Sequence, residues 1–181
     1  GSGGEDGYDP VAGTNTALRT LNHYAFWVPI MLGGAAGGNL HWRANYDFRL
    51  HPDFRENGRR LSAWLDSERP FLRAMEHVWD GPPLGDCPQE TGGYWAAGYR
   101  KANRAALYLL NKDARWDVPD ADIAPIAGAQ HTLTGLTDGT YRVVYTDPLT
   151  GIDSAPLSVT VSGGTLTLAL PTFARDLAIK V

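Results

Sequence analysis

The sequence has little of several features that mark common protein classes. A single cysteine, Cys87, among 181 residues excludes an internal disulfide and a cysteine-rich metal site. No run of 18 apolar residues occurs, so we expect no membrane-spanning segment. The net charge of −4 provides no excess of positive charge to neutralise phosphates, so we expect no nucleic-acid partner.

The composition is that of a globular protein with long ordered loops. Hydrophobic residues make up 43% of the chain and aromatic residues 10%, which is enough to bury a sizeable core. The 21 glycines and 12 prolines predict many turns without reaching low complexity. The first ten residues lack the basic and apolar regions of a signal peptide, so we expect any export signal to lie upstream.

The first half of the chain has helical periodicity. Residues 16–32 place apolar side chains at helical spacing and end at two glycines, and Pro29 is expected to kink this helix. A second helical region is expected from about Phe54 to Trp79, divided near Pro70, with an apolar face opposite a charged one. The apolar positions of the first helix are Leu18, Leu21, Ala25, Val28 and Leu32.

The second half changes to short strands separated by turns. Residues 81–93 are rich in glycine and proline and predict a connector. Beyond them, strand-length segments recur every 8 to 12 residues or so, which predicts a small antiparallel β-sandwich over residues 94–181. These segments are residues 94–101, 104–111, 130–136, 140–147, 156–161, 165–170 and 176–181.

A short extended stretch ending at Trp42, followed by an irregular loop, separates the two helical regions. Helix, strand, loop and helix is the order of the last βα unit of an α/β barrel, in which strand ends and the loops after them form the active site. A complete barrel needs about 250 residues. We therefore predict an α/β plus all-β chain, in which residues 1–80 are the C-terminal βα portion of a TIM barrel and the sandwich follows.

Five sequence motifs resemble a known family. The E-x-G of residues 5–7, LNHYAFWVPIMLGGAAGGNLHW of residues 21–42 and RANYD of residues 43–47 are similar to the C-terminal part of the barrel in retaining, family-5-like (clan A) glycoside hydrolases. TYRVVYTDPLTG and DLAIKV, in residues 140–151 and 176–181, are similar to the small β-sandwich that follows the barrel in many such enzymes.

The resemblance implies a retaining β-glycosidase that hydrolyses oligo- or polysaccharides. It assigns Glu5 as the nucleophile and Trp42 as the sugar platform, with Arg43, Tyr46 and Asp47 as polar contacts to the substrate. The acid/base carboxyl group of such a pair lies about 5 to 5.5 Å from the nucleophile. It would come from an earlier strand, so we expect a second chain to supply the rest of the barrel. The resemblance implies a secreted or periplasmic protein, and we expect no metal or cofactor.

Each of these residues also has a structural interpretation. Glu5 could be a solvated residue of a glycine-rich terminus, Trp42 a core aromatic, and Tyr46 and Asp47 loop-packing residues. The alternative function is a noncatalytic sandwich that binds carbohydrate or braces a neighbouring domain. Its aromatic residues lie mainly within strands, where alternation buries about half of them, so we expect bracing rather than binding.

Two further groups of polar residues have structural interpretations that we favour. His23, which lies within the first helix, is expected to form a structural hydrogen bond rather than to act in catalysis. His41 and His51 are too isolated to predict a metal site. The acidic string of residues 117–122 could bind calcium through oxygen ligands, but an exposed solvated loop explains it better.

Overall fold

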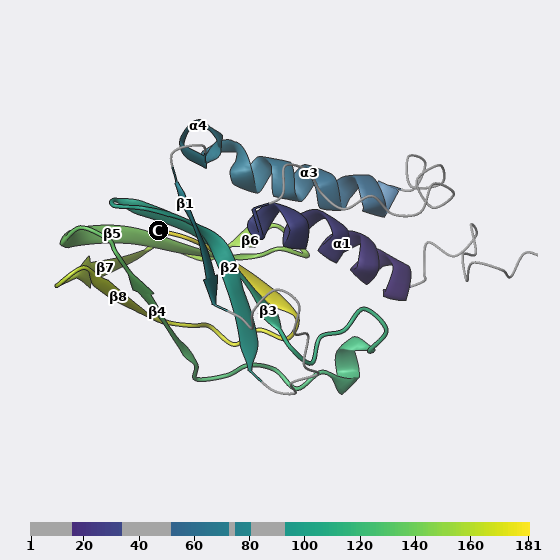
Figure 1. Ribbon diagram of the computed structural model, residues 1–181. Helices are drawn as coiled ribbons and strands as arrows, with labels where there is room; N and C mark the ends of the chain where they lie inside the picture. Colours follow the sequence, from purple (N-terminus) through teal and green to yellow (C-terminus); the bar gives the residue numbers. More distant parts are fainter. Residues whose placement is uncertain (1–15, 34–51, 73–74, 81–92) are drawn as a thin grey trace, which may run out of the picture.

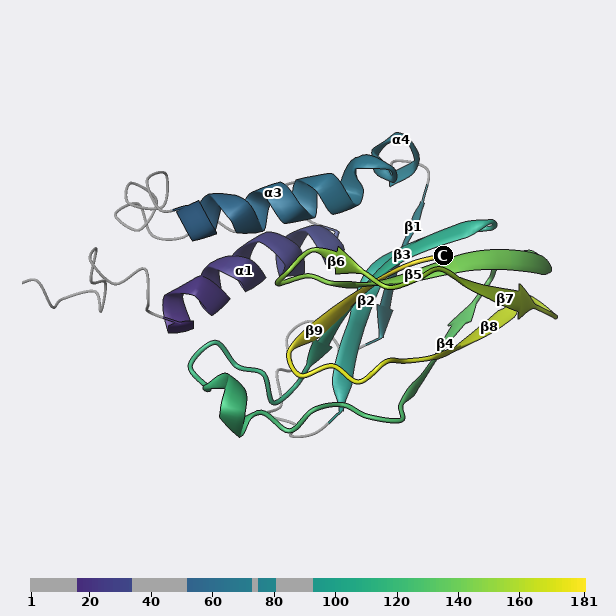
Figure 2. The same ribbon diagram turned by 180° about the vertical axis from the view of Figure 1, so that it is seen from behind.

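The computed structural model describes residues 16–33, 52–72, 75–80 and 93–181 (Figures 1 and 2). The helices are α1 (Thr16–Met31), α3 (Pro52–Asp66) and the single turn α4 (Arg69–Leu72). A 3₁₀ turn, η1, covers Asp120–Asp122. Among the described helices, none has the length and apolar character needed to cross a membrane.

Two antiparallel sheets form the rest of the described chain. The larger sheet has the order β1 (Glu76–Asp80), β2 (Tyr94–Lys101), β3 (Arg104–Asn111), β9 (Asp176–Lys180), β5 (Gly139–Asp147) and β6 (Ile152–Asp153). Strand β7 (Leu157–Val161) also pairs with β5. Strands β4 (Gln130–Thr134) and β8 (Thr165–Ala169) form the second sheet.

The two sheets enclose the main hydrophobic core. Side chains alternate between buried and exposed along β4 and β8, as expected for strands with one face on a core. Their inward residues, such as Leu133 and Leu166, meet Leu107 of β3 and Val143 of β5 in one buried cluster. The two sheets therefore pack face to face across this cluster and form the β-sandwich.

The helices cover the other face of the large sheet and form a third layer (Figures 1 and 2). The sheet presents mostly small side chains to them, with Ala97 on β2, Ala106 on β3 and Ala178 on β9. Small residues on a sheet face let bulky helix residues approach closely, and here Trp27 and Met31 of α1 are almost completely buried. A second core therefore joins α1 and α3 to the sandwich.

Helices α1 and α3 are parallel neighbours. Asn57 Nδ2 donates to Asn22 Oδ1 at 2.9 Å near the start of both helices, and the rings of Trp27 and Trp64 meet further along at 5.2 Å between centroids. Residue numbers increase together along this contact, so the two helices run in the same direction, as Figures 1 and 2 show.

The sequence-based prediction of the elements is confirmed in most places. All seven strands expected after residue 93 are present, and the first helix ends before Gly33, whose φ is +89°. The helical region divides after Asp66, close to Pro70. The expected continuation of helix to Trp79 is wrong, because Glu76–Asp80 pairs as β1 with β2. The described residues are mainly antiparallel β-structure, and the barrel portion remains a prediction.

Candidate functional site

The predicted catalytic and sugar-binding residues fall outside the described part of the chain. Glu5 precedes α1, whereas Trp42, Arg43, Tyr46 and Asp47 lie between the end of α1 and the start of α3. His41 and His51 also lie outside it. Their roles stay predictions. The structure does describe the two helices, α1 and α3, that precede and follow the segment containing Trp42, and the contacts that fix them to the sheet.

A buried polar cluster links α1 to the sheet. His23 Nε2 lies 2.5 Å from Asp176 Oδ2 of β9, and the Tyr108 hydroxyl of β3 donates to the same oxygen at 2.7 Å. The side chains of His23 and Asp176 are only 2% and 3% exposed. The expectation of a structural hydrogen bond at His23 is therefore confirmed, and this burial leaves no room for a substrate.

Aromatic stacking places both helices on the sheet beside this polar cluster. The Trp27 ring stacks on Tyr108 with centroids 5.4 Å apart and an interplanar angle of 19°. On α3, Trp64 Nε1 donates to Thr146 Oγ1 of β5 at 3.1 Å, and Lys180 Nζ lies 5.1 Å from the Trp64 ring centroid. The two helices are thus fixed to the central strands β3, β9 and β5.

Arg175 forms the centre of a second polar cluster at the start of α1. Its guanidinium pairs with Asp120, donates to the Val118 carbonyl at 2.6 Å and reaches the Tyr24 hydroxyl at 3.3 Å. That hydroxyl in turn donates to the Ala114 carbonyl at 2.7 Å. The loop that contains the acidic string is therefore held against α1.

Two carboxylates of the acidic string are bound to arginines. Asp120 pairs with Arg175, and Asp117 forms a two-pronged ion pair with Arg115 at 2.5 and 3.0 Å. Within the described ranges no group of three or more His, Cys, Asp or Glu side chains is arranged to hold a metal ion. The expectation of an exposed loop is confirmed, and two of its carboxylates form ion pairs in addition.

We expect the stability of the protein to fall between about pH 10 and pH 12. Burial, and then the nearby Asp176 carboxylate, raises the pKa of Tyr24 from 10.0 to about 12. The folded state then holds the proton more tightly than the unfolded state. The stabilisation is full below pH 10 and is lost as the pH rises through about 12. A shift of this size corresponds to about 2 to 3 kcal/mol.

Chemical unfolding followed across this pH range, together with the tyrosinate absorbance, measures the effect. In Tyr24→Phe we expect a shallower alkaline loss of stability. Some alkaline loss of stability should remain in Tyr24→Phe, because burial also raises the pKa of Tyr108 well above its ordinary value. Equal pH profiles for the two proteins would contradict the assignment to Tyr24.

The described aromatic residues do not form a sugar-binding row. Three tyrosine hydroxyls donate hydrogen bonds to main-chain carbonyls at 2.5 to 2.9 Å, those of Tyr94, Tyr99 and Tyr145. These side chains therefore stabilise the fold. Trp116 is 48% exposed but lies in the loop after β3. This arrangement favours a bracing role for the sandwich over carbohydrate binding.

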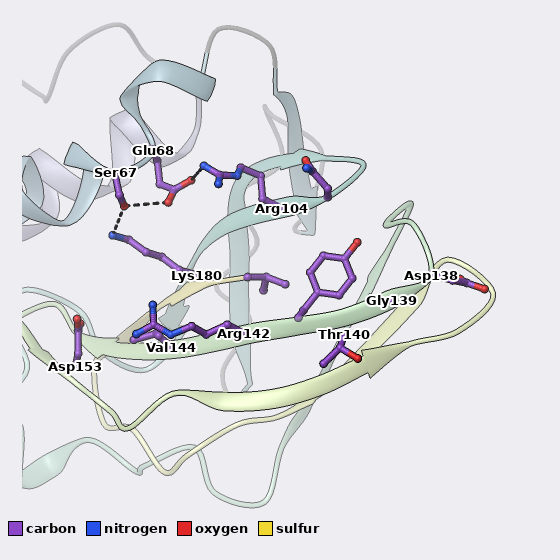
Figure 3. Close-up of a pocket in the computed structure, with 13 residues that line it drawn as sticks. Ser67, Glu68, Arg104, Asp138, Gly139, Thr140, Arg142, Val144, Asp153 and Lys180 are labelled. Atoms are coloured by element: carbon purple, nitrogen blue, oxygen red, sulfur yellow. Dashed lines mark hydrogen bonds and ion pairs between the residues drawn. The ribbon is translucent and has the colours of Figure 1, made fainter.

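A cavity of about 650 Å³ opens between the turn that joins α3 to α4 and the end of the large sheet (Figure 3). Lys180 Nζ donates to Ser67 Oγ at 2.9 Å, and Ser67 Oγ donates to Glu68 Oε1 at 3.0 Å. Arg104 Nη1 completes the chain at 3.3 Å from Glu68 Oε2. Sequence reasoning missed this cavity, because its residues come from four separate elements and no motif joins them.

Comparison with known proteins identifies no family. No family model and no curated protein sequence matches the chain. Among solved structures, the chain is similar to the crystal structure of a GH30 endoxylanase from Clostridium papyrosolvens C71, with a TM-score of 0.33 and 16% sequence identity. The match covers 61% of this chain and 24% of the endoxylanase chain. At this TM-score the match defines neither the fold nor the activity of this chain.

Proposed function

We propose that the chain is the C-terminal part of a retaining β-glycosidase that hydrolyses oligo- or polysaccharides by double displacement. In this proposal α1 and α3 belong to the outer helical layer of a barrel, and a second polypeptide supplies the remaining βα units. The supporting observation is the parallel packing of these two helices, which the Asn22–Asn57 and Trp27–Trp64 contacts define.

Two parallel neighbouring helices of one chain need a connection that returns along the whole length of the first helix. Helix α1 has 16 residues and is therefore about 24 Å long at 1.5 Å per residue. An extended chain covers that distance with about seven residues. Residues 34–51 are numerous enough for such a strand with a loop on each side. A returning strand between parallel helices is the repeating unit of an α/β barrel.

The surface of α1 also supports a further layer of protein. His23, Trp27 and Met31 face the sandwich and are almost completely buried. About a third of a turn around the helix, a second apolar stripe is only half-buried, and two of its members, Val28 and Leu32, also touch the helix–sheet core. This stripe consists of Leu21, Ala25, Val28 and Leu32. Helix α3 is different, because its outward residues include the exposed Arg59 and Asp66. A helix that is apolar on both sides suits a position between two packed layers.

The proposed chemistry uses the residues that the family resemblance assigns. Glu5 attacks the anomeric carbon, while an acid/base carboxyl group on the second polypeptide protonates the leaving oxygen and then activates water. Trp42 stacks on the sugar, and Arg43, Tyr46 and Asp47 bind its hydroxyl groups. The sandwich acts as a brace that fixes the helices on either side of the segment containing Trp42.

Replacement of Glu5 by glutamine tests the proposal. In the assembled protein, we expect a mechanism-based glycosyl inhibitor to form a covalent ester with wild-type protein and none with Glu5→Gln, because an amide cannot act as the nucleophile. Intact-mass spectrometry measures the added glycosyl group, and peptide mapping locates it.

Glu76→Gln is the matched control, because Glu76 is an exposed glutamate on β1 whose side chain is 69% accessible. Labelling of this variant should equal that of wild type. Retained labelling of Glu5→Gln, with the label on another carboxylate, would place the nucleophile elsewhere and refute the assignment.

A further inference from the structure

Helix α3 contains the only asparagine–glycine pair of the sequence, Asn57–Gly58. Every other asparagine is followed by a larger residue. Glycine has no side chain and turns freely about its backbone, so its main-chain nitrogen reaches the amide carbon of a preceding asparagine more easily than that of any other residue. Once the chain is extended, this pair is therefore the position most prone to deamidation.

The fold does not require a glycine at position 58. Gly58 is not among the glycines with positive φ. A Cβ at this position would lie 3.4 Å from the Phe26 ring of α1, which is an ordinary van der Waals distance. Glycine inside a helix is destabilising relative to alanine. Neither backbone conformation nor lack of space accounts for this residue, and its clearest effect is on the reactivity of Asn57.

The packed helices protect the pair. Asn57 is only 4% exposed, and its Nδ2 donates to Asn22 Oδ1 of α1 at 2.9 Å. Deamidation requires the nitrogen of Gly58 to approach Asn57 Cγ, whereas inside an α-helix that nitrogen donates its hydrogen along the helix. The reaction therefore requires α3 to unwind locally, and unwinding separates Asn57 from Asn22.

We propose that Asn57 is a modification site that deamidates only when α3 leaves α1. In the opened helix the Gly58 nitrogen attacks Asn57 Cγ. The new N–Cγ bond forms, the Cγ–Nδ2 bond breaks, and ammonia leaves with the proton from the Gly58 amide. Water then opens the cyclic imide. Cleavage at the side-chain carbonyl gives aspartate, and cleavage at the main-chain carbonyl gives isoaspartate, so water is the only co-reactant.

Both products oppose the return of α3 to α1. Isoaspartate lengthens the main chain by one carbon, which breaks the hydrogen-bond register of the helix. Aspartate places a charge in a buried position, which is costly unless the charge is paired. Asn22 Nδ2 has no partner among the described residues and could donate to that carboxylate after an amide rotation. We therefore expect isoaspartate to disturb the helix pair more than aspartate. The site is independent of the proposed activity.

Peptide mapping by mass spectrometry tests the proposal on the full-length chain at mildly alkaline pH. In urea we expect Asn57 to deamidate before any other asparagine. In native buffer the same reaction should be at least about tenfold slower, because it waits for a local opening. Hydrogen exchange of the α3 amides measures that opening. Both rates should rise together as urea is added below the unfolding transition.

Three variants separate the chemistry from the opening. Gly58→Ala should slow the reaction in urea, because a side chain hinders attack by the nitrogen. Trp27→Ala, which removes a ring that packs on Trp64 of α3, should accelerate deamidation in native buffer. Trp116→Ala is the control at a 48% exposed residue outside both helices and should leave the rate unchanged. Equal rates in native buffer and urea, earlier reaction of another asparagine in urea, or equal acceleration by both tryptophan variants would overturn the proposal.

Discussion

Asp176→Ala should destabilise the protein by about 3 to 5 kcal/mol, because it leaves two buried polar groups without their partner, at about 1 to 3 kcal/mol each. The Asp176 carboxylate accepts hydrogen bonds from His23 of α1 and Tyr108 of β3. His23 Nδ1 already has no partner among the described residues, so the substitution would leave both ring nitrogens buried and without a described partner. Such a loss is a large fraction of the 5 to 15 kcal/mol that typically stabilises a domain.

Urea unfolding monitored by tryptophan fluorescence measures this change. Tyr108→Phe removes only one hydrogen bond to the same carboxylate and should cost about 1 kcal/mol. Asp66→Ala, at an aspartate whose side chain is 77% exposed, should remain within about 0.5 kcal/mol of wild type. A cost below about 1 kcal/mol for Asp176→Ala would show that the buried cluster does not hold α1 to the sheet.

Trp27→Ala is the second substitution with a large expected effect, about 3 to 5 kcal/mol. Trp27 is 1% exposed and lies between Tyr108 of the sheet and Trp64 of α3. Its indole nitrogen has no hydrogen-bond partner in the part of the chain that the structure describes, so we expect the loss to come from packing and from the cavity left behind. We therefore expect Trp27→Phe, which keeps an aromatic ring, to cost distinctly less than alanine.

Hydrogen exchange distinguishes local from global effects of Trp27→Ala. Amides of α1 should lose protection more than those of β4 and β8, which belong to the other core. Trp116→Ala provides the control, because Trp116 is 48% exposed and belongs to neither core. Uniform loss of protection across both sheets would mean that the helices and the sandwich unfold as one unit.

The strands were predictable because their signals are local. Alternating segments are separated by turn residues such as Gly151, with a φ of +73°, and the pair Gly163–Gly164. The boundaries of these strands could therefore be predicted from the sequence, and alternation indicates which residues share a face of the sheet. Strand β1 was not predictable in this way. Pairing of Glu76–Asp80 with β2 is a tertiary interaction, and it overrides the helical spacing that precedes it.

Periodicity identified α1 but not its buried face. Leu21, Ala25, Val28 and Leu32 were recognised by their helical spacing, whereas the most deeply buried residues of this helix include His23, Trp27 and Met31. Both sets of residues have helical spacing. Because the helix is apolar around most of its surface, periodicity alone does not identify the face that is buried most deeply. The half-buried stripe is consequently the best indication in this chain of a further packed layer.

The two sites differ in how the sequence could identify them. Glu5 and Trp42 were assigned by resemblance to a family, and they lie outside the described residues. The cavity of Figure 3 could not be predicted, because lining residues such as Arg104, Arg142 and Lys180 become neighbours only through the order β3–β9–β5. That order depends on long-range pairing rather than on local sequence.

The native mass of the purified protein tests most directly whether α1 and α3 belong to a barrel completed by other βα units. Native mass spectrometry and a denaturing gel on one sample would be compared. We predict an assembly in which this chain copurifies with a larger polypeptide, and protection of the Leu21–Leu32 stripe of α1 by that partner in hydrogen exchange. A homogeneous, stably folded 19.7 kDa monomer would contradict the account.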